Sequence, residues 1–171
     1  MRSSSLFKSL LDHWPLAGAC ASAAMLAGAH AFETFGGYAP CHLCLYQRDV
    51  YWVALGVGVA GFILGYMRLK WARPAADALL ALIFLVSMGV AAYHAGVEWK
   101  WWPGPASCTG AGKVTADALK DFLNQTKVST PQCDQAAWTM FGISMAGYNA
   151  VISLGLVVLS VLAVRRERDH G

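Results

Sequence analysis

Residues 50–67 form the uncharged stretch VYWVALGVGVAGFILGYM. A helix of about 20 apolar residues is long enough to cross the hydrocarbon core of a bilayer. Its glycines, such as Gly56, Gly58 and Gly61, would weaken a helix in water but are common in membrane helices. This stretch therefore predicts a membrane-spanning helix.

Three further stretches have the same apolar character, at about 14–35, 75–97 and 140–164. Only 13% of the 171 residues are charged, whereas a soluble domain usually carries roughly 25%. Gly and Ala are frequent in all four stretches, and small residues let membrane helices approach closely. We expect a single all-α membrane domain, built as an antiparallel four-helix transmembrane bundle.

The charges predict how the bundle is oriented. Eight basic residues flank the spans on the side of the termini: Arg2, Lys8, Arg68, Lys70, Arg73, Arg165, Arg166 and Arg168. The loop at about 36–49 holds only Arg48, and the four lysines of the loop at about 98–139 are balanced by four acidic residues. The positive-inside rule places both termini in the cytoplasm. We expect a multi-pass protein whose two loops lie outside, in the oxidising periplasm if the host is a Gram-negative bacterium.

The first span also resembles a cleavable signal peptide, because Arg2 and Lys8 precede an apolar run that contains Ala29-His30-Ala31. However, the charged leader is long, and the apolar run continues to Phe35. We therefore favour a retained span.

A C-x-x-C pair, Cys41-His42-Leu43-Cys44, follows Pro40 and precedes the span at 50–67. If a helix begins near Cys41, its N-terminal partial charge stabilises a thiolate, and so does a nearby cation. Arg48, four residues after Cys44, is a candidate for that cation. A structural ion pair between Arg48 and Asp49 is the alternative.

The second outer pair is Cys108 and Cys133, with 24 residues between them. Alone, this pair would suit a permanent loop disulfide, but beside a reactive C-x-x-C we favour thiol–disulfide exchange. Between them, a short amphipathic helix on the membrane surface is predicted by Val114, Ala118, Leu119, Phe122 and Leu123. The fifth cysteine, Cys20, lies within the first span and is expected to be a packing residue.

Two alternative chemistries are disfavoured. A structural zinc site usually takes two close-spaced cysteine pairs, and Cys108 and Cys133 are far apart in the chain. Covalent haem attachment needs C-x-x-C-H, but Leu45 follows Cys44. We expect no metal and no nucleic-acid partner.

The segment Pro40 to Arg48, with the sequence PCHLCLYQR, resembles the first periplasmic loop of the disulfide bond formation protein B family (DsbB). Gly104-Pro105-Ala106-Ser107-Cys108 and the later Cys133 resemble its second loop. The resemblance covers the whole chain, including four spans, both loops and the order of the cysteines. It implies a quinone-linked thiol oxidase that sustains disulfide bond formation in the periplasm.

The resemblance also implies a role for each matched residue. Cys108 and Cys133 would form the disulfide that oxidises a DsbA-like, thioredoxin-fold partner, with Cys108 attacked and Cys133 re-oxidised through Cys41. Cys44 would face the ring of ubiquinone or menaquinone as a thiolate donor. Arg48 and His94 would lie beside the quinone, with Arg48 on a carbonyl oxygen whose negative charge develops on reduction.

Other residues near these sites have less defined predicted roles. An interfacial, purely structural histidine is the alternative for His94, and Glu98 is expected to orient Arg48 or His94. His42 is hypothesised to make the cysteine pair more oxidising. Three tryptophans are expected to anchor the outer membrane interface: Trp99, Trp101 and Trp102.

Competing functions are a specialised oxidase with a dedicated partner and a membrane protein with purely structural disulfides. Arg48 and His94 argue against the second, because structural disulfides need neither residue. Vitamin K epoxide reductases share a four-helix and C-x-x-C arrangement. Their reactive pair comes late in the chain, whereas here it heads the second span.

Overall fold

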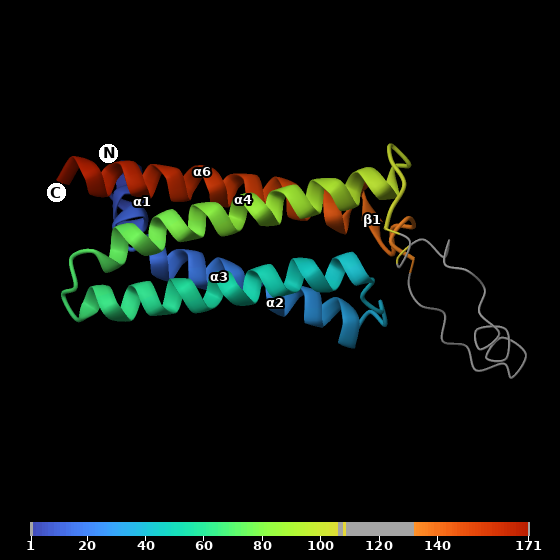
Figure 1. The fold of residues 1–171 in the computed structure, drawn as a ribbon, viewed down its shortest axis with the longest axis horizontal. Coiled ribbons are helices and arrows are strands. Elements are labelled where there is room, and N and C mark those ends of the chain that lie inside the picture. The colour runs from blue at the N-terminus through green and yellow to red at the C-terminus, as the bar shows by residue number, and fades with distance from the viewer. Residues whose placement is uncertain (1, 106–107, 109–131, 171) are drawn as a thin grey trace, which may run out of the picture.

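Four long antiparallel helices form the body of the part of the chain that the structure describes. The computed structural model describes residues 2–105, 108 and 132–170, so the amphipathic helix expected around residues 114–123 lies outside the described residues. The helices are α2 (Trp14–Thr34), α3 (His42–Tyr66), α4 (Ala72–Glu98) and α6 (Met145–His170). Figure 1 shows them aligned with the long axis, with both termini at one end. All four are long and apolar enough to cross a membrane, which confirms the predicted all-α bundle.

A small hairpin precedes α6. Strands β1 (Thr139–Met140) and β2 (Ile143–Ser144) pair antiparallel, with Thr139 opposite Ser144. The two residues between them, Phe141 and Gly142, have φ angles of 51° and 77°, and such turns match the twist of a hairpin. As a result α6 begins at Met145, rather than near Met140 as the apolar run suggested.

A short N-terminal helix, α1 (Arg2–Asp12), was not predicted. It exposes Leu6 and Phe7 at the end of the bundle where the termini lie. The side chain of Arg166 on α6 donates to Asp12, with 2.5 Å between Nε and Oδ1. An apolar face beside basic residues suits a helix that lies at a membrane surface.

Glycines set how closely the long helices approach. A Cβ at Gly58 on α3 would lie 2.9 Å from the Cβ of Ala19 on α2, and a Cβ at Gly61 would overlap Ala76 on α4. The predicted packing through small residues is therefore present at both interfaces of α3. Leu80 and Phe84 fill the centre of the bundle and are fully buried.

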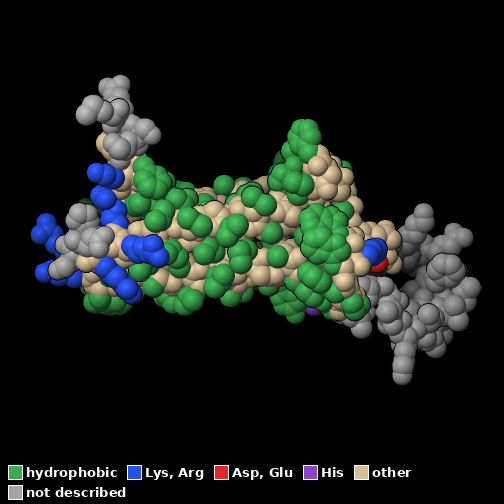
Figure 2. All heavy atoms as spheres, turned by 90° about the horizontal axis from the view of Figure 1, so that it is seen from above, with side chains coloured by type: hydrophobic (Ala, Val, Ile, Leu, Met, Phe, Trp, Pro, Cys, Tyr) green, Lys and Arg blue, Asp and Glu red, His purple; other side chains and the backbone are tan. Residues whose placement is uncertain are grey.

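Apolar side chains also cover the outside of the bundle, as Val53, Leu82 and Leu154 illustrate. Figure 2 shows this apolar surface between two ends of different character. Lys and Arg side chains gather at the end that holds the termini, which we call the basic end. The opposite end, with Cys41 and the hairpin, is called the cysteine end.

Candidate functional site

Cys41 is the N-cap residue of α3. Its φ and ψ of −77° and 170° are extended, and its Sγ accepts a hydrogen bond from the backbone N–H of Cys44 at 3.3 Å. The free N–H groups at a helix start give that end a partial positive charge, which stabilises a thiolate. The helix therefore begins where the sequence predicted, and it directs its N-terminus at the C-x-x-C pair.

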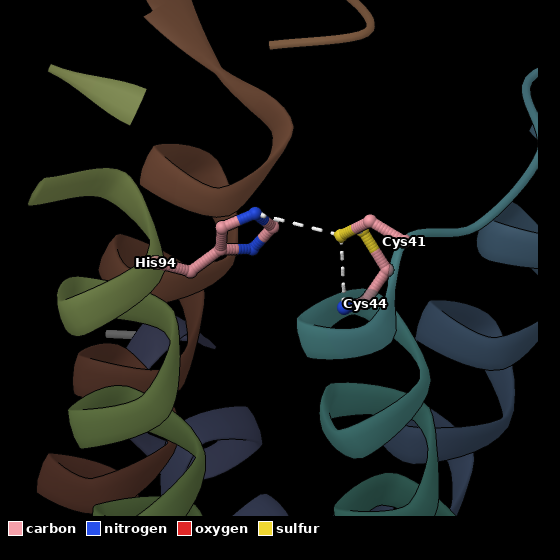
Figure 3. Close-up of side chains that lie close together, drawn as sticks. All are labelled: Cys41, Cys44 and His94. Atoms are coloured by element: carbon pink, nitrogen blue, oxygen red, sulfur yellow. Dashed lines mark hydrogen bonds between the residues drawn. The ribbon is translucent and has the colours of Figure 1, made fainter. Parts of the chain in front are cut away.

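The two sulfurs of this pair lie 2.6 Å apart, and both cysteines are present as free thiols (Figure 3). Cys41 is 5% exposed. The hydrogen bond with Cys44, together with burial, raises the pKa of the Cys41 thiol above its usual value. When one thiol of this reduced pair ionises, Cys41 is therefore the one that keeps its proton.

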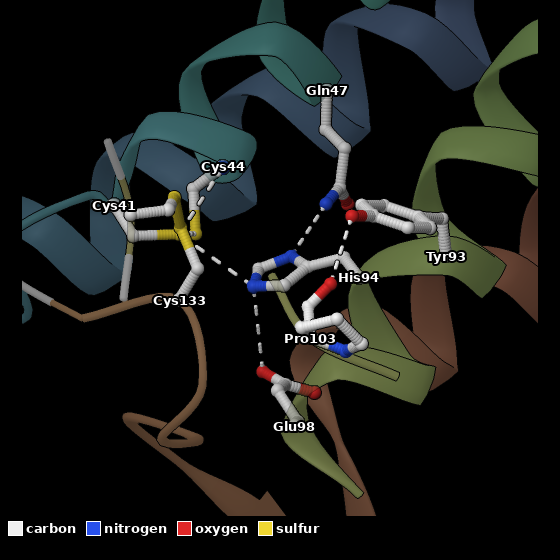
Figure 4. Close-up of a disulfide and its surroundings, with 9 residues drawn as sticks. Cys41, Cys44, Gln47, Tyr93, His94, Glu98, Pro103 and Cys133 are labelled. Carbon is white, nitrogen blue, oxygen red and sulfur yellow. Dashed lines mark hydrogen bonds and ion pairs between the residues drawn. A yellow bond between two sulfur atoms is a disulfide. The ribbon is translucent and has the colours of Figure 1, made fainter. Parts of the chain in front are cut away.

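Cys108 and Cys133 are joined in a disulfide, with their Cα atoms 5.2 Å apart. Both are buried, and they pack in one cluster with Cys41, Leu43 and Cys44. Figure 4 shows Cys133 beside Cys41. The fold thus brings together all four cysteines that the sequence singled out, although the two pairs come from different loops.

His94 lies on α4 and faces the C-x-x-C pair. Its Nε2 is 3.6 Å from the Sγ of Cys41 and 3.7 Å from a carboxylate oxygen of Glu98. Its Nδ1 is 2.8 Å from the side-chain nitrogen of Gln47. His94 is buried and hydrogen-bonded, and it contacts Glu98. The suggested role of Glu98 in orienting a basic group remains a prediction.

Arg48 pairs with a residue that the sequence analysis did not choose. Its guanidinium forms an ion pair with Glu33 near the end of α2, and its Nη2 donates to the carbonyl of Ala29 at 3.1 Å. The alternative partner Asp49 is the next residue along the helix, about 100° further round the axis. Its direction explains why Glu33, and not Asp49, reaches Arg48.

A cavity of about 550 Å³ adjoins these side chains. Cys44, Arg48 and His94 lie in its wall, together with apolar residues such as Met25 and Ile152. The cavity volume lies within the range of about 300–1,000 Å³ for small-molecule sites, which combine apolar walls with a few polar groups. The arrangement can hold a flat apolar molecule against a thiol, a guanidinium and an imidazole.

Three side chains at this site could each supply one ligand atom to a metal ion. The ligand atoms of Cys41, Cys44 and His94 all lie within 4.8 Å of one another. The four-sulfur zinc site weighed from the sequence would need Cys108 and Cys133 as thiolates, but they are bonded to each other.

A family model described as "Disulfide bond formation protein DsbB" matches residues 12–163. The chain belongs to the DsbB family. A relative named disulfide bond formation protein B, from Dechloromonas aromatica (strain RCB), is 33% identical over 144 residues, 81% of this chain and 83% of the relative. Another with that name, from Xanthomonas axonopodis pv. citri (strain 306), is 29% identical over 163 residues, 91% and 92% of the two chains.

DsbB membership implies a membrane-embedded oxidoreductase that forms disulfide bonds, in agreement with the four spans and the cysteine pairs. In this DsbB-family chain, sequence reasoning missed Glu33, Gln47 and Asn149. The available signal was their polarity within or beside apolar spans. Polarity alone did not show which side chains these residues contact, because the rotation of each helix about its axis decides which side chains meet.

The predictions for Cys20 and His42 have different outcomes. Cys20 was expected to be a small packing residue, but it is an exposed free thiol on α2, so that expectation was wrong. His42 packs edge-on against Tyr46, with ring centroids 4.9 Å apart. Its suggested effect on the redox potential remains a prediction.

Proposed function

We propose that this chain reoxidises a DsbA-like, thioredoxin-fold dithiol protein in the periplasm and passes the electrons to a membrane quinone. One observation carries the proposal: the Cys108–Cys133 disulfide packs against Cys41 and Cys44, and Cys44 borders the apolar cavity. Electrons that enter at one pair therefore have a path of adjoining sulfurs to the other. Membership of the DsbB family supports the same direction.

The partner's reaction begins at Cys108. A partner thiolate attacks its Sγ, the bond to Cys133 breaks, and the electron pair leaves on the Sγ of Cys133. The second partner thiolate then breaks the mixed disulfide and leaves Cys108 as a thiolate. The partner thereby gains a disulfide, and this chain gains two electrons.

The first pair enters the cycle as a Cys41–Cys44 disulfide. The Cys133 thiolate attacks the Sγ of Cys41, a Cys41–Cys133 bond forms, and Cys44 leaves as a thiolate. Exchange of this kind needs a thiolate in reach of an accessible disulfide. The common cluster of these sulfurs supports the step.

The cavity fits ubiquinone or menaquinone, because apolar residues surround a few polar groups. A bound quinone supplies an acceptor for two electrons and two protons. Arg48 and His94 would hold its carbonyl oxygens, and a fixed guanidinium stabilises negative charge strongly in a site without water. Cys44 lies in the same wall, where its thiolate would be the electron donor to a bound quinone.

The proposed topology puts the basic end in the cytoplasm and the cysteine end in the periplasm of a bacterial inner membrane. The gathering of Lys and Arg at the basic end supports it, through the positive-inside rule. A general and a dedicated partner protein would use the same site.

The deciding experiment uses the full chain, purified in detergent with ubiquinone and a reduced thioredoxin-fold partner. Quinone reduction should be lost in Cys44→Ser and, separately, in Cys108→Ser. Cys20→Ser is the matched control, since its thiol lies outside the cluster, and it should retain turnover. Continued turnover in both site variants would reject the proposal.

A further inference from the structure

A chain of buried polar side chains leads from the centre of the bundle to His94. The Tyr51 hydroxyl donates to Oδ1 of Asn149 at 2.6 Å, and Nδ2 of Asn149 donates to Oε1 of Gln47 at 2.5 Å. Gln47 then reaches Nδ1 of His94 at 2.8 Å. All four residues are buried, and they come from α3, α4 and α6.

The hydrogen bonds in this series all run in one direction, from donor to acceptor toward His94. Oδ1 of Asn149 is held by two hydroxyl groups, since Ser153 also donates to it, at 3.3 Å. The Asn149 amide therefore turns its NH₂ group to Gln47, and Gln47 turns its own NH₂ group to His94. Because an amide NH₂ only donates, Nδ1 of His94 must accept and carries no proton.

The other side of the imidazole faces acceptors. Nε2 lies 3.6 Å from the Sγ of Cys41 and 3.7 Å from Oε1 of Glu98 (Figure 4). The backbone of Cys133 also hydrogen-bonds to the ring. A neutral imidazole has one donor nitrogen and one acceptor nitrogen, so the proton belongs on Nε2.

We propose that Tyr51, Asn149 and Gln47 are positioning residues that hold His94 as its Nε2–H tautomer and aim this N–H at the Sγ of Cys41. The inference rests on the proposed function and deepens it, because it gives His94 a role at the sulfurs as well as at the cavity. Neither the family match nor the spacing of residues in the chain assigns these three residues.

The step that uses this N–H is the release of Cys41. When the Cys108 thiolate attacks Cys133 in the Cys41–Cys133 disulfide, the Cys108–Cys133 bond forms and the electron pair of the broken bond stays on Cys41. The Nε2–H of His94 donates to the resulting thiolate. A hydrogen bond to a charged group is stronger than one between neutral groups, so the release is favoured.

The test reads the tautomer directly. In the full-length protein with ¹⁵N-labelled histidine, purified in detergent, the His94 signals are identified by their loss in His94→Asn. We expect Nδ1 to be unprotonated and Nε2 protonated. In Gln47→Glu a carboxylate replaces the donor, so Nδ1 should gain a proton. In Tyr51→Phe the Asn149 amide keeps only Ser153, at 3.3 Å, as a hydroxyl donor, so its orientation is less fixed and Nδ1 should be protonated in part of the molecules.

Tyr93→Phe is the matched control, because it removes a hydroxyl that bonds only to Pro103 among the described contacts. It should leave the His94 signals unchanged. A proton on Nδ1 in the unaltered chain would overturn the proposal, and so would an unprotonated Nδ1 in Gln47→Glu.

A second readout is the rate at which a small thiol releases Cys41 from the Cys41–Cys133 disulfide of a Cys44→Ser, Cys108→Ser double variant. Gln47→Met leaves Nδ1 without its donor, so this release should be about three- to tenfold slower. An unchanged rate would remove the link to Cys41. Both measurements omit quinone and partner protein, so they do not depend on turnover. If His94 has the expected tautomer but the protein shows no thiol oxidase turnover, the proposed function is rejected and the tautomer proposal stands.

Discussion

The guanidinium of Arg48 on α3 is paired with the carboxylate of Glu33 on α2. The Arg48 side chain is only 14% exposed, whereas that of Glu33 is 39% exposed. A cation near a bilayer is costly without a partner, so this pair lets Arg48 remain charged beside the apolar cavity. It also ties together two helices that line the cavity.

Replacement of Arg48 by Met should slow quinone reduction about 10²–10³-fold, the usual effect of removing one group that stabilises a developing oxyanion. Oxidation of a reduced partner by the Cys108–Cys133 disulfide, measured in a single turnover without quinone, should continue at its normal rate. Lys70→Met, at the basic end, is the control for loss of one positive charge. Equal loss in both half-reactions would show that Arg48 acts on folding instead.

A double variant, Cys44→Ser with Cys108→Ser, should accumulate a Cys41–Cys133 disulfide under mild oxidation. These two cysteines belong to one cluster, and the double variant removes the usual partner of each. Peptide mapping without reduction measures the product. A predominant disulfide of either residue with Cys20 would contradict the proposed order of exchange.

The reduced protein should react unequally with iodoacetamide at neutral pH. Contact with Cys44 and burial raise the pKa of Cys41, so its thiol keeps its proton until the pH rises beyond the usual thiol range of about 8.5. Mass mapping should therefore find Cys44 alkylated before Cys41. In Cys44→Ser that contact is lost, and Cys41 should react at lower pH than in the unaltered chain.

Gly61→Ala should destabilise the bundle, because the added Cβ overlaps Ala76 on α4. Overpacking of this kind costs about 1–3 kcal/mol and lowers the midpoint of thermal unfolding in detergent. Gly56→Ala is the control, since nothing lies within 4 Å of its added Cβ. A loss of stability in both variants would point to the helix backbone rather than to the contact between α3 and α4.

Acid should weaken the cysteine end through Asp134. The hydrogen bond from Lys100 holds the pKa of this carboxyl below its usual value. A lowered folded-state pKa adds stability that is present above the unfolded pKa of about 3.9 and is lost as the pH falls through the folded value. The unfolding midpoint of Asp134→Asn should therefore depend less on pH below about 4. Lys100→Met should show the same change, and the two effects should not add.

The sequence predicted the spans and the reactive cysteines because each depends on local information. An uncharged run long enough to cross a bilayer, such as 50–67, defines a helix without knowledge of its neighbours. Cys41 and Cys44 are only three positions apart in the chain and follow Pro40, so the N-terminus of a helix could be expected at this pair. The contact between Cys133 and Cys41 could be predicted only from the family resemblance.

Contacts between helices were harder to predict. Glu33 is a charge near the end of the span at about 14–35, but its approach to Arg48 depends on how α2 and α3 are rotated. Asn149 in α6 meets Gln47 for the same kind of reason. The apolar side chains of Met140, Phe141 and Ile143 made the hairpin resemble the start of the last span, although Gly142 is a local signal for a turn.

The clustering of four redox-capable sulfurs at one end of the bundle has a thermodynamic consequence. After it accepts two electrons, the chain retains a single disulfide, and neighbouring sulfurs can exchange that bond. The half-reduced protein is then a set of interconverting isomers, each populated according to its own strain and thiol acidity. The midpoint potential of this reduction step depends on the summed populations of all the isomers, so a substitution that stabilises one isomer shifts the potential of the whole protein.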